Sequence, residues 1–214
     1  MKRYFTVSLL FMFMVLTGFS QEHYSLFFSS GYDYNLNHLS DMKYSNSSEF
    51  PDYNLGLGGA VYLNDRFRLR AELKYANVSF TRKYNFQTTT DGTIDRSVLS
   101  ISNLDFNPYI DYRIFSIGKF DFYGYTGLRF EFNVGSSQYV YTLDGEKFSK
   151  NLVETNYKKA MVGLTGGCSL SYNINKKFAV SISPEYTQFL NYFYSDNTSN
   201  FKRSSVNLGL EWKF

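Results

Sequence analysis

The chain is poor in the residues on which much catalytic and metal chemistry depends. Its single cysteine, Cys168, excludes an intramolecular disulfide and a metal site with several cysteine ligands. Only two histidines and three prolines occur in 214 residues. Beyond the first twenty residues, no apolar run approaches the ~18 residues that a membrane-spanning helix needs. These absences argue against a disulfide or zinc scaffold and against a helical membrane protein.

The N-terminus has the layout of a secretory signal. Two basic residues open the chain, an apolar stretch from Val7 to Leu16 follows, and the small residues Gly18 and Ser20 come next. This order is typical of a cleaved signal peptide, so we expect removal of residues 1–20 and a mature domain over 21–214. The mature chain keeps 20 basic and 19 acidic residues, a net charge of +1. Such a balance gives no electrostatic basis for binding nucleic acid.

Alternation of apolar and polar residues with a period of two dominates the rest of the chain. It is clearest at the C-terminal end, where Val206, Leu208, Leu210, Trp212 and Phe214 share one face. Several strands exceed the five or six residues usual in soluble sheets and match the ~9–11 residues of a tilted membrane strand. We expect eight strands, over residues 24–34, 53–63, 67–82, 98–114, 120–134, 159–174, 178–190 and 203–214.

The connections between these strands alternate between short and long. The short ones are 64–66, 115–119 and 175–177, and the long, polar ones are 35–52, 83–97, 135–158 and 191–202. Short periplasmic turns and longer external loops are typical of outer-membrane barrels, whereas a β-sandwich has no reason to sort its loops in this way. The sequence therefore predicts an all-β, antiparallel, up-and-down transmembrane barrel of about eight strands, located in the outer membrane with both termini periplasmic.

The charged faces of the strands are expected to line the lumen. An Arg or Lys that faced lipid at mid-membrane would cost about 2–4 kcal/mol, so the apolar faces contact the lipid of the outer membrane. An eight-stranded barrel is just wide enough for side chains to fill its interior. Paired charges would therefore close the lumen. The expected lumen charge network consists of Arg68, Arg70, Glu72, Lys74, Asp105, Arg113, Asp121, Arg129, Glu131 and Glu185.

Turn lengths give predicted cross-strand pairs on the polar face. In the register favoured by the 115–119 link, Asp105 opposes Arg129 and Arg113 opposes Asp121, which makes two complementary charge pairs. The other short links place small residues opposite long charged ones. These pairs are Gly56 with Lys74, Gly58 with Glu72, Ala60 with Arg70 and Gly167 with Glu185.

Aromatic residues make up 20% of the chain and gather near both ends of the predicted strands. Amphipathic rings at the two membrane interfaces form girdles in such barrels. The expected members are Phe67, Phe120, Phe122, Phe178, Trp212 and Phe214 at the periplasmic end, and Tyr32, Tyr34, Tyr53 and Tyr75 at the external end.

Two features resemble known barrel families. The alternating residues Val206, Leu208, Leu210, Trp212 and Phe214 resemble the C-terminal signal by which the barrel assembly machinery recognises its substrates, which implies that machinery as a partner during biogenesis. The segments FSQ at 19–21, SPEY at 183–186 and NLGLEWKF at 207–214 resemble those of compact OmpA-like and PorT-like barrels of the Bacteroidota. The PorT-like resemblance implies, by analogy, an accessory role in an envelope or secretion complex.

Candidates for chemistry are few. His38 lies near Ser40 and Asp41 in a predicted loop, but contiguous loop residues lack the preorganisation that catalysis needs. Acidic loop residues show no calcium-loop spacing; they are Asp41, Glu49, Asp52, Asp91, Asp95, Asp144 and Glu146. We therefore assign no catalytic, cofactor or metal site. Cys168 falls on the apolar face, where it would pack as a small residue against lipid.

Three functions stay open at this point. The first is a non-enzymatic, closed barrel that acts through its external loops or within an envelope complex. The second is transport of small solutes or ions through the lumen, which needs the charge network to open. The third is modification of lipid A with His38 as the catalytic base. The charge-filled lumen and the lack of a preorganised catalytic cluster favour the first.

Overall fold

A computed structural model describes residues 24–35, 44–45, 52–89, 92–149, 159–192 and 200–214. The predicted signal peptide over 1–20 and both histidines, His23 and His38, lie outside these residues. In the described part of the chain, no helix is long and apolar enough to cross a membrane.

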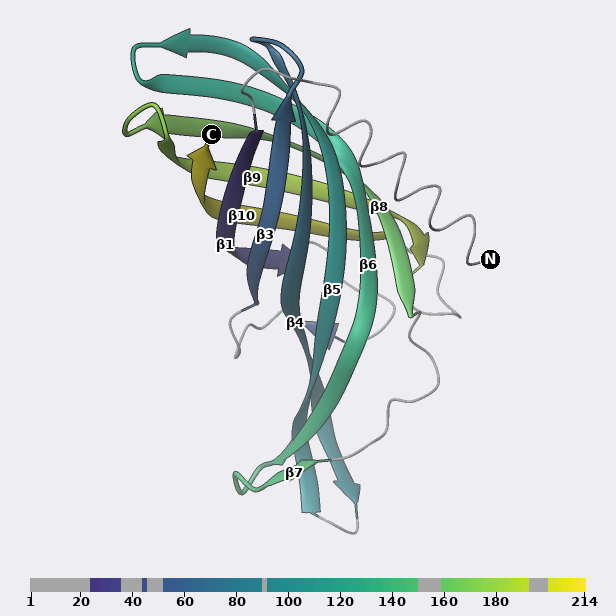
Figure 1. Cartoon of the computed structure of the whole chain (residues 1–214). Coiled ribbons are helices and arrows are strands. Elements are labelled where there is room, and N and C mark those ends of the chain that lie inside the picture. Colours follow the sequence, from purple (N-terminus) through teal and green to yellow (C-terminus); the bar gives the residue numbers. More distant parts are fainter. Residues whose placement is uncertain (1–23, 36–43, 46–51, 90–91, 150–158, 193–199) are drawn as a thin grey trace, which may run out of the picture.

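Eight antiparallel strands close into a ring (Figure 1), which confirms the predicted barrel. Around the ring the order is β1, β3, β4, β5, β6, β8, β9, β10 and back to β1. Two short strands, β2 (Tyr44–Ser45) and β7 (Lys147–Ser149), add to β4 and β6 outside the ring. The eight ring strands are β1 (Tyr24–Asn35), β3 (Tyr53–Tyr62), β4 (Phe67–Thr89), β5 (Gly92–Ile117), β6 (Phe120–Thr142), β8 (Ala160–Asn173), β9 (Phe178–Tyr192) and β10 (Asn200–Lys213).

The three short connections all lie at one end of the barrel, which we call the turn end. They link β3 to β4, β5 to β6 and β8 to β9. The β5–β6 turn needs only Gly118 and Lys119, and Gly118 adopts a φ of 61°, a conformation that residues with a Cβ avoid. At the same end, the Phe214 N–H donates to the Tyr24 carbonyl, 3.0 Å away. The start of the first ring strand, β1, and the end of the last, β10, therefore meet there.

At the opposite end, three strands continue well past the rest of the barrel (Figure 1). β4, β5 and β6 have 23, 26 and 23 residues, whereas the other ring strands have 10 to 15. β6 loses its β8 partner after Phe132, and β4 loses its β3 partner after Asn77. We call the continuation the extension: residues 78–89, 92–102, 133–142 and β7. The prediction of loops over 83–97 and 135–158 was therefore wrong for most of the described residues, which pair as strands.

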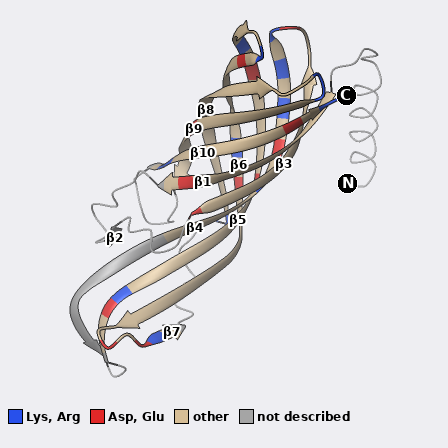
Figure 2. Ribbon diagram, turned by 90° about the vertical axis from the view of Figure 1, so that its left-hand side faces the viewer, with Lys and Arg blue, Asp and Glu red and all other residues tan. Residues whose placement is uncertain are grey.

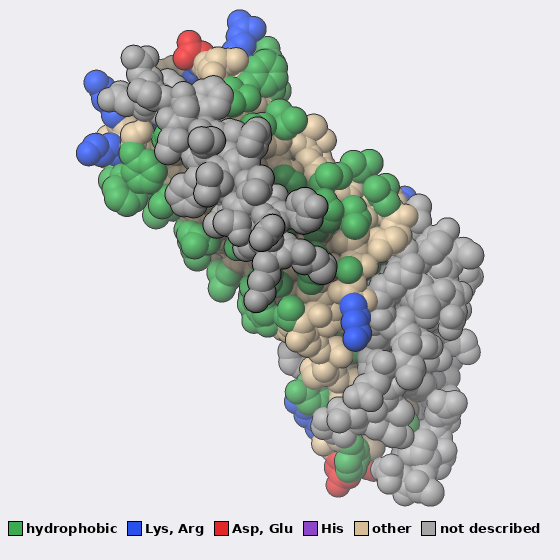
Figure 3. Space-filling model, turned by 45° about the vertical axis from the view of Figure 1, so that its right-hand side comes forward, with side chains coloured by type: hydrophobic (Ala, Val, Ile, Leu, Met, Phe, Trp, Pro, Cys, Tyr) green, Lys and Arg blue, Asp and Glu red, His purple; other side chains and the backbone are tan. Residues whose placement is uncertain are grey.

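The outer wall of the barrel is apolar, as predicted (Figure 3). Leu57 and Leu208, for example, are 64% and 63% exposed. Some of the residues predicted for the girdles contact each other at the two ends of the barrel. At the turn end, Phe178 stacks on Trp212 with ring centroids 6.2 Å apart, and at the other end Tyr53 lies 6.4 Å from Tyr75. These faces fit a lipid environment.

The register across the β5–β6 turn differs from the prediction by two residues. Asp105 lies opposite Glu131, not Arg129. Two causes are visible: the turn is shorter than the predicted 115–119 link, and a β-bulge at Ile114 inserts an extra residue. The predicted pairs Gly56–Lys74, Gly58–Glu72, Ala60–Arg70 and Gly167–Glu185 are all present.

Candidate functional site

The lumen is filled by long charged side chains from one half of the wall that meet small residues on the other half. Figure 2 shows Lys and Arg segments beside Asp and Glu segments within the barrel. β4, β5 and β6 supply most of the arginines and carboxylates. β8, β9, β10 and β1 face them mainly with serine and glycine, and this half includes the buried Ser25, Ser29, Ser169, Ser171, Ser183 and Ser205. The size mismatch lets both halves fit into a narrow interior.

The layer nearest the turn end is built around Arg68. Its Nε lies 2.6 Å from Asp111 Oδ2, and its Nη1 lies 3.2 Å from Glu211 Oε1. The guanidinium also covers the Tyr123 ring at 4.2 Å, and the Tyr62 hydroxyl donates to Glu211 over 2.8 Å. Because Glu211 belongs to β10, this layer ties β4 to a strand that is not its neighbour in the ring.

The middle layer contains Arg70 and Lys74. Arg70 lies over the Tyr109 ring at 4.5 Å, and the Tyr109 hydroxyl donates to Glu185 Oε2 at 3.0 Å. Lys74 Nζ lies 3.5 Å from Glu72 Oε2 and 4.0 Å from Glu185 Oε1. A cavity of about 30 Å³ lies among these side chains, which is enough for water.

The third layer centres on Arg129, which is fully buried. Four carboxylates surround its guanidinium: Asp105 at 2.5 Å, Glu131 at 3.6 Å, Glu185 at 3.6 Å and Asp33 at 3.7 Å. Buried charges are tolerated only when paired in this way. Arg129 therefore joins β5 and β6 to β9 and β1.

Above the third layer, apolar side chains close the lumen toward the extension. Phe189 and Phe201 are 0% and 1% exposed, with ring centroids 5.4 Å apart, and Met161 is also buried. Arg203 lies 5.4 Å from both rings and forms an ion pair with Glu131 at 2.6 Å. This apolar plug was not predicted, since apolar residues were assigned to the lipid face.

The structure brings together eight of the ten residues named for the lumen network. Arg113 and Asp121 lie instead at the turn end, where their side chains are 3.9 Å apart and Arg113 is 30% exposed. The network also includes four residues that were not predicted from the sequence: Asp33, Asp111, Arg203 and Glu211. Each lies on the inward face of an alternating strand, so strand parity was the signal that could have found them.

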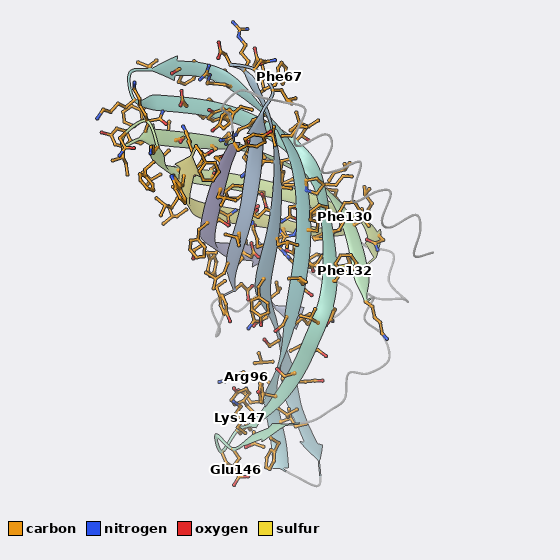
Figure 4. All side chains as sticks on the ribbon, viewed as in Figure 1. Phe67, Arg96, Phe130, Phe132, Glu146 and Lys147 are labelled. Atoms are coloured by element: carbon orange, nitrogen blue, oxygen red, sulfur yellow. The ribbon has the colours of Figure 1, made fainter. Side chains whose placement is uncertain are left out.

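The extension carries a ladder of basic and aromatic side chains. Arg96 lies over the Tyr141 ring at 4.9 Å, and Lys147 Nζ lies over the Tyr139 ring at 3.9 Å. Arg96, Tyr141 and Lys147 are register partners across β5, β6 and β7, so they share one face. Figure 4 shows Arg96 and Lys147 at the far end of the molecule from Phe67. Arg96 also forms an ion pair with Asp95 at 2.8 Å, so this face offers a partner mainly the exposed Lys147 and the two tyrosine rings.

Other candidate sites are sparse. No group of three or more His, Cys, Asp or Glu within the described ranges is arranged to hold a metal ion. Cys168 lies opposite Gly124 on the outer face of the barrel. The five residues of the predicted assembly signal are all half-exposed on the outer face of β10: Val206, Leu208, Leu210, Trp212 and Phe214.

A closed eight-strand ring with an apolar exterior and a charged interior defines the class of the protein as a membrane β-barrel. The chain belongs to the family described as "Outer membrane protein beta-barrel domain", whose model matches residues 19–191. It is therefore an outer-membrane protein of the Gram-negative envelope. A comparison with curated proteins gives no match.

Solved structures of other small barrels resemble this one. OprG from Pseudomonas aeruginosa is 14% identical with a TM-score of 0.51, over 90% of this chain and 96% of OprG. Neisserial surface protein A is 13% identical with a TM-score of 0.46, over 89% and 97% of the two chains. Ail, the attachment invasion locus protein of Yersinia pestis, is 13% identical with a TM-score of 0.45, over 91% and 99%. At such identities a likeness speaks for the fold alone.

Proposed function

We propose that this protein is a non-enzymatic barrel with a closed lumen that acts through its extension on the outer side of the membrane. The observation that carries the proposal is the extension itself. Three strands and the paired β7 hold Lys147 and the tyrosine rings beyond the closed ring of strands, in register. On the other side, the short strand β2 pairs with β4. Sites for partners are commonly held on such projecting segments by a rigid scaffold.

The closed lumen supports a binding role over transport. Three ionic layers and the apolar plug of Met161, Phe189 and Phe201 fill the interior between the two ends. A cavity of about 30 Å³ holds water but no larger solute. We expect purified protein in a planar lipid bilayer to give no steady conductance. A stable conductance with defined steps would contradict the closed barrel and favour transport.

The proposed orientation places the turn end in the periplasm and the extension outside, because outer-membrane barrels have short periplasmic turns. In a Cys168→Ala background, Asp144→Cys on the exposed turn of the extension should react with an impermeant maleimide on intact cells. Lys176→Cys, at the turn end, should react only after the outer membrane is permeabilised. The reverse labelling pattern would overturn the orientation.

The absence of catalysis is part of the same proposal and needs its own test. We expect lipid A mass spectra to be identical in wild-type and deletion strains. A mass difference of one acyl chain would point to lipid A modification instead.

A further inference from the structure

Two of the three turns at the turn end are copies of one rigid motif. Residues 63–67 (LNDRF) and 174–178 (INKKF) share an aliphatic residue, Asn, a variable residue, a basic residue and Phe. In the first, Asn64 Oδ1 accepts hydrogen bonds from the N–H groups of Arg66 (2.8 Å) and Phe67 (2.9 Å). In the second, Asn175 Oδ1 accepts from Lys177 (2.8 Å) and Phe178 (2.9 Å). Each turn therefore fixes a basic residue at its fourth position.

The basic turn residues are hydrogen-bonded to the ends of neighbouring strands. The Arg66 carbonyl accepts from the Arg113 N–H, and the Lys177 carbonyl accepts from the Lys213 N–H, both at 2.7 Å. In the third turn, the Lys119 carbonyl accepts from the neighbouring strand at 2.8 Å. These bonds place basic residues side by side around the rim, and most of the residues that they join are cationic.

The rim encloses a bowl of about 440 Å³ at the mouth of the lumen. Arg113, Lys176, Lys177 and Lys213 line it, with two carboxylates, Asp65 and Asp121. Cations therefore outnumber carboxylates by four to two. Arg113 and Asp121 lie 3.9 Å apart and offset each other, and Asp121 also accepts a 2.7 Å hydrogen bond from the Asn173 amide. The remaining charged side chains of the bowl are Lys176, Lys177 and Lys213, with Asp65 as their only carboxylate among the described lining residues.

The bowl lies at the turn end of the lumen and reaches the outer rim of the wall at Tyr24 and Phe214. Its lining residues Tyr123 and Lys213 lie on the inward faces of their strands, whereas Phe120 and Phe178 point outward at the same level. The floor is sealed by the Arg68 layer. A ligand would therefore come from the aqueous compartment at the turn end and would cap the barrel without passing through it.

We propose that this basic bowl docks an acidic segment of a periplasmic protein. The assignment to the periplasm rests on the orientation given under the proposed function. Carboxylate side chains suit the site because Arg113 offers a forked donor and the lysines offer mobile point charges. The volume admits several side chains, which fits a peptide segment better than a single small ion. Such docking would give the barrel a partner on each side of the membrane.

The test uses full-length mature protein in a zwitterionic detergent and a fluorescein-labelled ten-residue peptide of alternating Glu and Ser. Binding is measured by fluorescence anisotropy at 50 mM NaCl. The turn-end variant combines Arg113→Gln, Lys177→Gln and Lys213→Gln. The control removes two exposed cations outside both proposed binding surfaces, through Lys159→Gln and Lys202→Gln, and is compared with Lys176→Gln and Lys177→Gln on the turn. Should the turn-end variant fail to fold, Lys176→Gln with Lys177→Gln changes the exposed turn alone.

We expect the turn-end variant to bind the peptide about tenfold more weakly than wild type, as the loss of several exposed ion pairs implies. The control should stay within twofold, and 300 mM NaCl should weaken wild-type binding strongly. Equal affinity for wild type and the turn-end variant, or an equal loss in the control, would overturn the proposal. Labelling that places Lys176 outside the cell would overturn periplasmic docking even if the peptide binds in detergent, so the two failures are distinct.

Discussion

Replacing Arg129 by Met should test whether the ionic layers hold the barrel closed. The substitution keeps much of the side-chain volume but leaves four carboxylates without their shared cation. Asp33 keeps two neutral donors, at 2.9 Å and 2.5 Å, and Glu131 keeps its ion pair with Arg203 at 2.6 Å. Asp105 depends on Arg129 for the ion pair at 2.5 Å. Removing one partner of a buried pair costs about 3–5 kcal/mol, so we expect Arg129→Met to lose that much unfolding free energy.

The assay is reversible urea unfolding of the mature protein in phospholipid vesicles, followed by tryptophan fluorescence. Lys159→Met, which changes an exposed residue, should stay within about 0.5 kcal/mol of wild type. Adding Asp105→Asn to Arg129→Met should recover at least about 1 kcal/mol, because the two residues contact each other. If Arg129→Met unfolds at the same urea concentration as the control, the ionic layers do not stabilise the barrel and the reasoning fails.

Three further predictions concern the wall of the barrel, and each is measured as the fraction of protein that migrates as a folded band in unheated detergent gels. Gly127→Val should abolish folding, because the added Cβ would overlap the Pro108 carbonyl oxygen; Gly135→Val should fold, since its nearest neighbouring atom would be 3.9 Å away. Gly118→Ala should fold with a loss of about 1 kcal/mol, because its φ of 61° disfavours a Cβ. Trp212→Ala should lower the folded amount in cells while refolding normally in detergent, as expected if Trp212 belongs to the assembly signal.

The strands and their faces could be predicted from the sequence because lipid and a packed lumen impose opposite chemistry on alternate residues. Along β10, Leu208 and Leu210 face outward while Ser205 and Glu211 are buried inside. The same parity predicted the cross-strand pair Gly56–Lys74. A period of two, sustained over many residues, leaves little freedom in which face of each strand points inward once the charged face is assigned to the interior.

Register at the β5–β6 turn could not be predicted in the same way. A bulge such as that at Ile114 depends on local backbone geometry that leaves no period in the sequence. The Arg129–Asp105 ion pair nevertheless forms, since a diagonal neighbour two residues away is still within reach of a long side chain. Charge complementarity therefore predicted which residues are in contact, but not which residues lie directly opposite each other.

The apolar plug and part of the extension were missed, each because a rule drawn from the local sequence pattern did not hold there. Residues such as Phe189 and Phe201 lie inside the barrel, where an apolar residue contradicts the rule that assigned apolar faces to lipid. Over residues 83–97 and 135–142, Ser, Thr and other polar residues weaken the alternation, and this polar composition was taken as a sign of loops. These residues form strands because they pair with neighbouring strands, and that pairing cannot be read from the local sequence pattern.

Ion pairs inside the barrel connect the strands of the extension to other strands of the wall. β4, β5 and β6 continue into the extension, and these same strands carry Arg68 and Arg129. Arg68 binds Glu211 on β10 at 3.2 Å, and Arg129 lies 3.6 Å from Glu185 on β9. These ion pairs connect two of the three strands to strands that are not their neighbours in the ring. Hydrophobic residues that face lipid cannot make such a connection, because only inward-facing residues of different strands meet across the lumen. The buried charges thus cross-link strands that do not pair with each other, an arrangement that requires no open pore.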